Sequence, residues 1–333
     1  MRVALDAFGT DNAPVPEIRG ALKILEDEKD IEVILVGDER RIREHLGNVP
    51  SRLSIVHAPE VVHHHDKPSE VLIKKPNSSM AVAMDLVRSG EADAFISAGN
   101  TGAVMAYALR KLGRIKGAKR PAIGALFPNI NEGRTLVLDM GANIHVSSDM
   151  LVQFGIMGAA FYNALFHRHP RLALLNIGEE EQKGGDVIVE ARKKLEMMDA
   201  HYRFVGYVEG HEILMDKADV IVMDGFVGNV LLKFGESILS TILEFIKREV
   251  KGNPRALLGA MLLKPAFKAV RKKADFEEYG GAPLIGVNGI VIISHGRSSA
   301  RAIYNAILVA RTLHQHRLIE KTQKYLAEAF QRS

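Results

Sequence analysis

The sequence predicts an α/β fold in which a mostly parallel sheet is flanked by helices. Short runs rich in Val, Ile and Leu alternate with segments of helical periodicity along the whole chain. Several of these runs are apolar almost throughout, which is typical of strands covered on both faces. Five glycine-rich segments directly follow such runs. We therefore expect right-handed crossovers and a ligand site at the carboxyl ends of the strands.

The expected elements follow from this alternation in chain order. Strands are expected at residues 2–8, 32–38, 53–58, 93–98, 135–141, 171–178, 203–208, 219–226 and 282–296. Helical spacing marks residues 79–90 and 186–198 among the connecting segments. No linker, internal repeat or low-complexity tract interrupts the series. Residues 1–333 are therefore expected to form a single catalytic α/β unit, or two interlocked subdomains.

Composition narrows the class of protein. The 333 residues are 47% hydrophobic and 25% charged, as in ordinary globular proteins. The absence of cysteine excludes disulfides, thiolate zinc sites, iron–sulfur clusters and a cysteine nucleophile. The N-terminus lacks a signal-peptide pattern, and no apolar run approaches the roughly 18 residues that span a bilayer. We expect a cytoplasmic protein, or one that lies peripherally on the inner face of the cytoplasmic membrane.

The net charge of +4 is unevenly distributed. Residues 251–273 contain seven basic and no acidic residues, and subtracting these seven charges from +4 leaves −3 for the rest of the chain. This indicates one docking patch and not a nucleic-acid-binding surface. Interleaved apolar residues suit anionic lipid, an acidic protein or an oligomer contact, and Pro265 is expected to prevent one straight helix. The residues expected to dock are Arg255, Leu258, Leu262, Lys264, Lys268, Arg271, Lys272 and Lys273.

Familiar catalytic signatures are absent from the chain. We find no G-x-x-x-x-G-K-[ST], no G-x-G-x-x-G after the first strand, and no G-x-S-x-G around Ser97. These absences disfavour a P-loop NTPase, an ordinary Rossmann dehydrogenase and a serine hydrolase. The triplet His63, His64 and His65 offers metal-ligand chemistry, but consecutive histidines seldom converge on one ion. No metal or other cofactor is therefore expected.

The segment "GNTGA" has the residue types of an anion site. It places Gly99, Asn100, Thr101 and Gly102 at the expected start of a helix, where unpaired N–H groups attract phosphate. A tight turn with Thr101 as the helix cap accounts for the same residues.

Three cationic residues are further candidates. In "DGFVGNVLLK", Lys233 lies one helical turn beyond Asn229, although a capped helix with an exposed lysine has the same pattern. Lys183 adjoins a pair of glycines and is either a ligand or a solvated loop charge. His295 follows an apolar strand and either faces a site or lies in the core.

Taken together, the motifs resemble those of the phosphate acyltransferase family. The resemblance rests on "DAFGTDNAP", "KKPNSSM", "ISAGNTGA", "LDMGAN", "NIGEEEQKG", "DGFVGNVLLK", "YGGAPLIG" and "SHG", in family order over nearly the whole chain. It implies a fold similar to that of phosphotransacetylases and the isocitrate/isopropylmalate dehydrogenases. It also implies a homodimer that makes acyl phosphate from acyl-carrier protein thioester and inorganic phosphate. The carrier is an acidic protein, and a glycerol-3-phosphate acyltransferase would use the product in phosphatidic acid and phospholipid synthesis.

The resemblance also assigns expected roles. Phosphate is an anionic nucleophile and a thioester has a good leaving group, so positioning and oxyanion donors are sufficient. The residues expected in catalysis are Lys183, His295, Asn229 and Lys233. The residues expected to bind phosphate or substrate, or to orient those that do, are Asp6, Gly9, Ser78, Ser79, Ser97, Gly99, Asn100, Thr101, Gly102, Asp139, Asn143, Asp224, Gly225 and Gly228. Phe8 and Thr10 depart from the family's usual "DAMGGD", and Thr10 is expected to narrow that loop.

Other classes of protein fit parts of the pattern. One is a phosphotransacetylase that uses acyl-CoA, and another is a metal- and NAD-dependent decarboxylating dehydrogenase on a similar fold. A non-enzymatic alternative is a membrane-bound scaffold, which would leave the glycine-rich strand ends unexplained. The small residues of "GIMGAAFYNAL", which begins at Gly155, are a candidate dimer contact.

Overall fold

A computed structural model describes residues 1–198, 201–274 and 280–331. It contains an eleven-stranded sheet in the order β3-β2-β1-β4-β11-β10-β5-β6-β9-β7-β8. The strands are β1 (Arg2–Asp6), β2 (Glu32–Gly37), β3 (Leu53–His57), β4 (Ala94–Ser97), β5 (Ala122–Pro128), β6 (Arg134–Leu138), β7 (Arg171–Leu175), β8 (Arg203–Val208), β9 (Val220–Val222), β10 (Ala282–Ile285) and β11 (Ile290–Ile293). The predicted fold class, a mostly parallel sheet flanked by helices, is confirmed.

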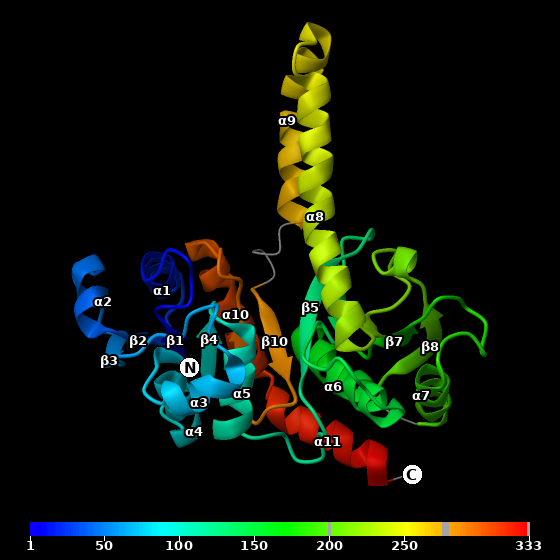
Figure 1. Ribbon diagram of the computed structural model, residues 1–333, viewed down its shortest axis with the longest axis horizontal. Helices are drawn as coiled ribbons and strands as arrows, with labels where there is room; N and C mark the ends of the chain where they lie inside the picture. Colours follow the sequence, from blue (N-terminus) through cyan, green and yellow to red (C-terminus); the bar gives the residue numbers. More distant parts are fainter. Residues whose placement is uncertain (199–200, 275–279, 332–333) are drawn as a thin grey trace.

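Helices connect the strands and cover both faces of the sheet (Figure 1). They are α1 (Val15–Asp27), α2 (Glu39–His45), α3 (Pro68–Lys74), α4 (Ser79–Ser89), α5 (Thr101–Lys111), α6 (Ser148–Phe166), α7 (Asp186–Met197), α8 (Gly225–Val250), α9 (Pro254–Ala274), α10 (Ala300–Gln315) and α11 (Leu318–Gln331). Side-chain caps fix several starts by accepting the N–H three residues ahead: Asp38, Ser78, Asn100, Ser147, Asp224 and Ser299.

The sheet consists of two parallel sets that run in opposite directions. Strands β1, β2, β3, β4 and β11 form one set, and β6, β9, β7 and β8 form the other. Strands β10 and β5 lie between the sets and pair antiparallel to their neighbours. The last residue of β11, Ile293, pairs with Ala282 at the start of β10. The last residue of β6, Leu138, pairs with Gly124 of β5, and the neighbouring Ile123 pairs with Leu284 of β10. Both sets therefore end at nearly the same level of the sheet.

Two features of the sheet differ from the sequence prediction. The predicted strand at residues 282–296 is a hairpin of β10 and β11, because Gly286 adopts a φ of +100° and reverses the chain. Strand β5 was not predicted, since Gly124 interrupts its apolar pattern, Pro121 precedes it and Pro128 is its last residue. A Cβ at Gly124 would lie 3.1–3.3 Å from side chains of Leu136, Leu138 and Ile285, so glycine permits the close packing here.

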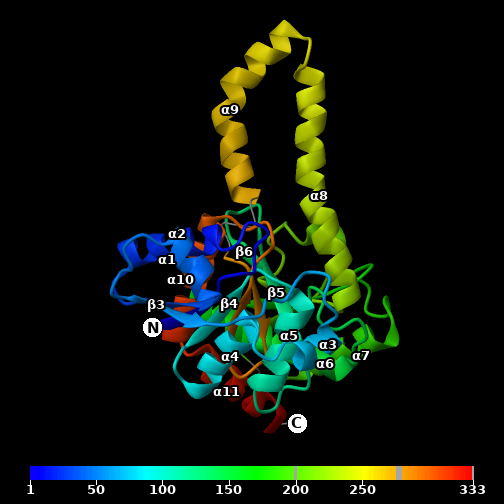
Figure 2. The ribbon, with the colours of Figure 1, turned by 60° about the vertical axis from the view of Figure 1, so that its left-hand side comes forward.

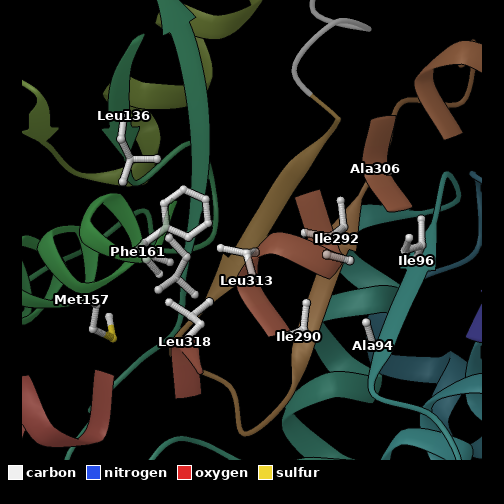
Figure 3. Close-up of a cluster of buried hydrophobic side chains, with 14 of the residues drawn as sticks. Ala94, Ile96, Leu136, Met157, Phe161, Ile290, Ile292, Ala306, Leu313 and Leu318 are labelled. Atoms are coloured by element: carbon white, nitrogen blue, oxygen red, sulfur yellow. The ribbon is translucent and has the colours of Figure 1, made fainter. Parts of the chain in front are cut away.

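Successive residues of each strand place their side chains on opposite faces of the sheet, in two separate cores. In β1, Val3 and Leu5 face one core, whereas Ala4 faces the other. The first core packs the sheet against α1, α6, α10 and α11, and Figure 3 shows its centre around Phe161 and Leu313. The second core packs the opposite face against α4 and α5. Burial on both faces explains the nearly continuous apolar strands.

Helix α6 lies inside the molecule. Its residues are buried almost throughout, and added Cβ atoms at Gly155 and Gly158 would lie 2.9 Å from Leu172 and 2.5 Å from Leu138. The interpretation of this small-residue face as a dimer contact is therefore wrong. The small side chains instead let α6 approach the sheet within the chain.

Helices α8 and α9 form a hairpin that projects from the sheet (Figure 2). Pro265 lies inside α9, which is one continuous helix, so the proline does not end the helix. Figure 2 shows α9 bending along its length, in agreement with the expectation that Pro265 prevents one straight helix. Among the described helices, none combines the length and the hydropathy that crossing a bilayer requires.

Truncation of Phe161 should test the first core. The side chain is fully buried, so Phe161→Ala should lower the free energy of unfolding by about 3–5 kcal/mol. Urea denaturation measures this change. The control Ile73→Ala removes a side chain that is 82% exposed and should cost less than about 0.5 kcal/mol. Equal losses in the two variants would contradict the assigned core.

Candidate active site

The loops after β1, β4 and β11 form a first loop cluster. At its base, the hydroxyl of Ser97 donates to Asp6 Oδ2 at 2.6 Å and accepts from the N–H of Gly99 at 3.1 Å. Asp6 also accepts a hydrogen bond from the N–H of Phe8 and forms one with the side chain of Ser79. Burial raises the pKa of Asp6, and these hydrogen bonds oppose the shift. Asp6 therefore ties the loop after β1 to the end of β4 and to the start of α4.

Glycines let the backbones of this cluster touch. A Cβ at Gly9 would lie 2.6 Å from the backbone nitrogen of Ala98, and one at Gly99 would lie 2.3 Å from the Met80 methyl group. At Gly102, the contact is Pro68, at 2.4 Å. The space beside these glycines is thus filled by protein atoms.

Both the oxygen and the nitrogen of the Asn100 side-chain amide form hydrogen bonds within the protein. Its Oδ1 accepts from the N–H of Ala103, so Asn100 and not Thr101 caps helix α5. Its Nδ2 donates to the carbonyl oxygens of His64 and Asp66, both at 3.0 Å. A bound phosphate would have to compete with these partners. Thr101 is the exposed first residue of α5.

The histidine triplet does not converge on a point. His63 and His65 stack at 5.5 Å between ring centroids, whereas His64 Nε2 lies 3.4 Å from Asp11 Oδ1. Across residues 1–198, 201–274 and 280–331, no three His, Asp or Glu side chains are arranged to hold a metal ion.

Ser78 and His295 lie at the margins of the first loop cluster. Ser78 caps α4 and donates to the hydroxyl of Tyr107 at 3.1 Å. His295 is exposed, and its Nδ1 accepts from the N–H of Arg297 at 3.1 Å. The neighbouring Ser294 hydroxyl is buried and has no hydrogen-bond partner among the described residues.

Glu17 is a residue of this cluster that the sequence analysis missed. Its carboxylate accepts from the N–H of Thr10 at 2.8 Å and from the Thr10 hydroxyl at 3.1 Å. Glu17 is fully buried, and this desolvation raises its pKa to about 7. The available signal was an acidic residue on the apolar face of a helix, in line with Ala21 and Ile24. Thr10 departs from the family pattern, and Glu17 holds both of its donors.

The loops after β6, β9 and β7 form a second loop cluster, with Asp139 at its centre. Asp139 Oδ1 accepts from the N–H groups of Ile123, Gly141 and Ala142 at 3.0–3.2 Å. Its Oδ2 accepts from the backbone and side-chain nitrogens of Asn143 at 2.7 and 2.9 Å. Burial raises the pKa of Asp139. The carboxylate joins β5 to the loop that follows β6.

The start of α8 rests on this loop. Asp224 caps the helix by accepting from the N–H of Val227 at 2.9 Å, and the N–H of Gly225 donates to the carbonyl of Asn143 at 2.7 Å. A Cβ at Gly228 would lie 1.9 Å from the Asp139 carbonyl oxygen. Only glycine fits this contact, which explains "DGFVGN" without a phosphate at Gly228.

The cationic candidates and Asn229 differ in their surroundings. Asn229 and Lys233 are exposed on the same face of α8. Lys183 Nζ lies 2.7 Å from Glu180 Oε1. The backbone carbonyl of Lys183 accepts a hydrogen bond from Asn176 Nδ2 at 2.9 Å. Lys183 thus belongs to a loop organised by Asn176.

The structure divides the candidate residues between two clusters. The first loop cluster holds Asp6, Gly9, Ser78, Ser79, Ser97, Gly99, Asn100, Thr101, Gly102 and His295, and the second holds Asp139, Asn143, Lys183, Asp224, Gly225, Gly228, Asn229 and Lys233. Strands β11 and β6 are three strand spacings apart in the sheet, roughly 14 Å. His295 is therefore grouped apart from Lys183 and Lys233.

The predicted docking segment lies on the hairpin. Arg255, Lys264 and Lys268 are exposed, and the side chains of Leu258 and Leu262 are 61% and 75% exposed. Arg271, Lys272 and Lys273 belong to the backbone of α9, but their side chains lie outside the described part of the structure.

The fold of the chain is shared with solved phosphotransacetylase structures. The fold matches a phosphotransacetylase from Streptococcus pyogenes with a TM-score of 0.64, at 18% identity over 94% of each chain. A 4-hydroxythreonine-4-phosphate dehydrogenase from Klebsiella pneumoniae matches with a TM-score of 0.55, at 13% identity over 94% of this chain and 98% of that one. These matches concern the fold alone.

Sequence comparison identifies the family. Residues 1–321 match the family model described as "Fatty acid synthesis protein". The phosphate acyltransferase of Dictyoglomus turgidum is 44% identical over 94% of each chain. The phosphate acyltransferase of Pelotomaculum thermopropionicum is 46% identical over 96% of this chain and 93% of its own. The chain belongs to the phosphate acyltransferase family, as the sequence motifs predicted.

Gly228 tests whether α8 must touch the Asp139 loop. Gly228→Ala should lower the free energy of unfolding by about 1–3 kcal/mol, because the added methyl group overlaps a carbonyl oxygen. The control Gly235→Ala lies on the same helix with nothing within 4 Å, and should stabilise by roughly 0.5–1 kcal/mol. Thermal unfolding distinguishes them. A neutral Gly228→Ala would show that the contact is dispensable.

Glu17 predicts a pH dependence of stability. Its pKa is raised from 4.5 to about 7, so the folded protein retains a proton that the unfolded chain has lost between these pH values. Stability should therefore fall as pH rises through this window, by about 3 kcal/mol for this group. Glu17→Gln should remove that fall and be the more stable protein at pH 8, as urea denaturation at several pH values would show.

Asp27→Asn provides a control on the same helix. Hydrogen bonding to Lys23 lowers the pKa of Asp27, so its contribution to stability is lost as pH falls. The two variants should therefore differ from the native chain in opposite directions. Parallel pH curves for Glu17→Gln and the native chain would contradict the burial of an ionisable group at this position.

Proposed function

We propose that this protein transfers a fatty acyl group from acyl-carrier protein to inorganic phosphate, producing acyl phosphate and free carrier. Membership of the phosphate acyltransferase family supports transfer of an acyl group to phosphate. The observation that carries the proposal for this chain is on α8, where a polar stripe and an apolar stripe run side by side from the second loop cluster.

The two stripes suit the two parts of an acyl phosphate. Asn229 and Lys233 form the polar stripe at i, i+4 spacing. Phe226, Val230 and Phe234 form the apolar stripe at the same spacing, and their side chains are 61%, 55% and 64% exposed. A phosphate at the amide and ammonium groups would thus have an apolar surface beside it for the acyl chain.

The reaction requires no nucleophile from the protein. An oxygen of phosphate attacks the thioester carbonyl, the new C–O bond forms, and the C–S bond breaks to release the thiolate. The proton from hydrogen phosphate passes to that thiolate, so atoms and charge balance. The protein must position the phosphate and stabilise the oxyanion.

The second loop cluster is the proposed place for this step. Its side chains Asn229 and Lys233 are exposed, whereas Asn100 of the first loop cluster already has partners for its amide. Asn229 donates to the developing oxyanion, and Lys183 and Lys233 neutralise phosphate charge. Asp139 and Asp224 orient the loop and the helix that carry these groups. His295 and the first loop cluster belong to the part of the site that receives the thioester.

The hairpin supports a peripheral position at a membrane. Apolar side chains of α9 are exposed beside Lys264 and Lys268, which suits anionic lipid. The apolar stripe of α8 continues through Ile238, Ile242 and Phe245 and gives a homodimer a contact surface. At the membrane, a glycerol-3-phosphate acyltransferase would consume the acyl phosphate in phosphatidic acid synthesis.

Turnover of the purified protein tests the reaction. Long-chain acyl-carrier protein and phosphate should give acyl phosphate, which hydroxylamine traps as the hydroxamate. Acyl-CoA should be the poorer substrate. A clear preference for acyl-CoA would favour a phosphotransacetylase, and no product from either thioester would refute the transfer.

Asn229 tests the placement of the step. Asn229→Ala should lower kcat about a hundredfold, because one oxyanion donor is lost. Lys217→Met removes an exposed lysine that is paired with Glu212 and should leave kcat unchanged. Full turnover by Asn229→Ala would remove α8 from the chemistry.

A further inference from the structure

A second basic segment, residues 110–120, was not singled out in the sequence analysis. This basic loop contains six basic and no acidic residues. Lys111 is paired with Asp85, and Lys119 is paired with Asp149 at 2.6 Å. The remaining basic residues are Arg110, Arg114, Lys116 and Arg120, all exposed. None of these four forms an ion pair with another described residue.

The basic loop is held in a defined shape. Ile115 and Ala118 are buried beneath it, and the N–H of Ile115 donates to the carbonyl of Gly286 at 2.9 Å. Gln153 of α6, itself 4% exposed, accepts from the N–H of Lys119 at 2.7 Å and donates to the carbonyl of Gly117 at 3.1 Å. The uncompensated charges therefore stand on a backbone that is ordered by buried contacts, and little ordering would remain for a partner to impose.

The basic loop adjoins the second loop cluster. Arg120 precedes Pro121, whose carbonyl accepts from Asn143 Nδ2 at 2.7 Å. The same Asn143 is bound to Asp139 at the centre of the cluster. A partner seated on the loop would thus lie beside the residues to which we assign acyl transfer.

The chemistry of the basic loop differs from that of the hairpin. In the hairpin, Leu258, Met261 and Leu262 are more than half exposed among the basic residues. No large hydrophobic side chain of residues 110–120 is exposed. The hairpin thus suits a surface that accepts apolar side chains, whereas the basic loop suits an acidic protein that binds and leaves through water.

We propose that the basic loop is the docking surface for the acidic carrier protein, with Lys116 and Arg120 as the main contacts. This inference rests on the proposed function. It assigns carrier docking to residues 110–120 and not to residues 251–273. Long-range attraction to the loop would speed encounter and orient the carrier, so that its thioester arm enters at the second loop cluster.

Charge reversal tests the surface. Lys116→Glu/Arg120→Glu should raise KM for acyl-carrier protein about tenfold or more, with kcat little changed. The same acyl chain on pantetheine lacks the acidic protein and should keep its KM. Added salt should raise the native KM for the carrier and have less effect on that of the variant. The matched control, Lys264→Glu/Lys268→Glu, places the same charge change on the hairpin and should leave the carrier KM unchanged.

Three outcomes would overturn the inference. They are an unchanged carrier KM in Lys116→Glu/Arg120→Glu, a raised carrier KM in the hairpin variant alone, and an equal loss on both substrates in folded protein. If the native protein turned over neither substrate, the proposed function would fail separately. Direct titration of the carrier against native protein and the variant would then decide docking, because equal affinities would refute the surface independently of turnover.

Discussion

The buried carboxylate of Asp139 is the interaction on which the rest of the site depends. It accepts five N–H bonds, from Ile123 of β5 and from the loop of residues 141–143. An ionised group without such donors would be costly at this depth, and the loop without the carboxylate would have unpaired N–H groups. The satisfied set fixes the surface on which Gly225 and Gly228 place α8. The positions of Asn229 and of the hairpin follow from that contact.

Much of the fold could be predicted because its strands are buried on both faces. Runs such as residues 32–38 and 93–98 have almost no polar face, and at such short length this pattern is typical of a strand inside a covered parallel sheet. Strand β5 could not be predicted, because Gly124 is needed to make room for side chains of β6 and β10. These side chains pack against it only in the folded chain. Likewise, the small residues of α6 indicate close packing in general, and only the structure shows that the partner is the sheet of the same chain.

The site was predictable in its motifs but not in its grouping. Each glycine-rich segment follows a strand as expected, yet the direction of a strand in the sheet depends on its pairing. Because the two parallel sets run in opposite directions, the motifs are divided between two clusters. The glycines were read as openings for phosphate, whereas at Gly9, Gly99 and Gly228 neighbouring protein atoms occupy the space. Glu17 was overlooked because a single acidic residue in a helix is ordinarily solvated.

Helix α8 is one rod of 26 residues, about 39 Å long, which begins on the Asp139 loop and ends near the tip of the hairpin. Because α8 is long and held at one end, a small tilt produces a large displacement at the other end. A tilt of about 5° at Gly225 displaces the far end by roughly 3 Å. The reverse also holds, since a displacement imposed at the tip becomes a small rotation around Asn229. Because α8 is one continuous helix, a movement of the outer part of the hairpin and a rotation of the polar stripe at its base are mechanically coupled.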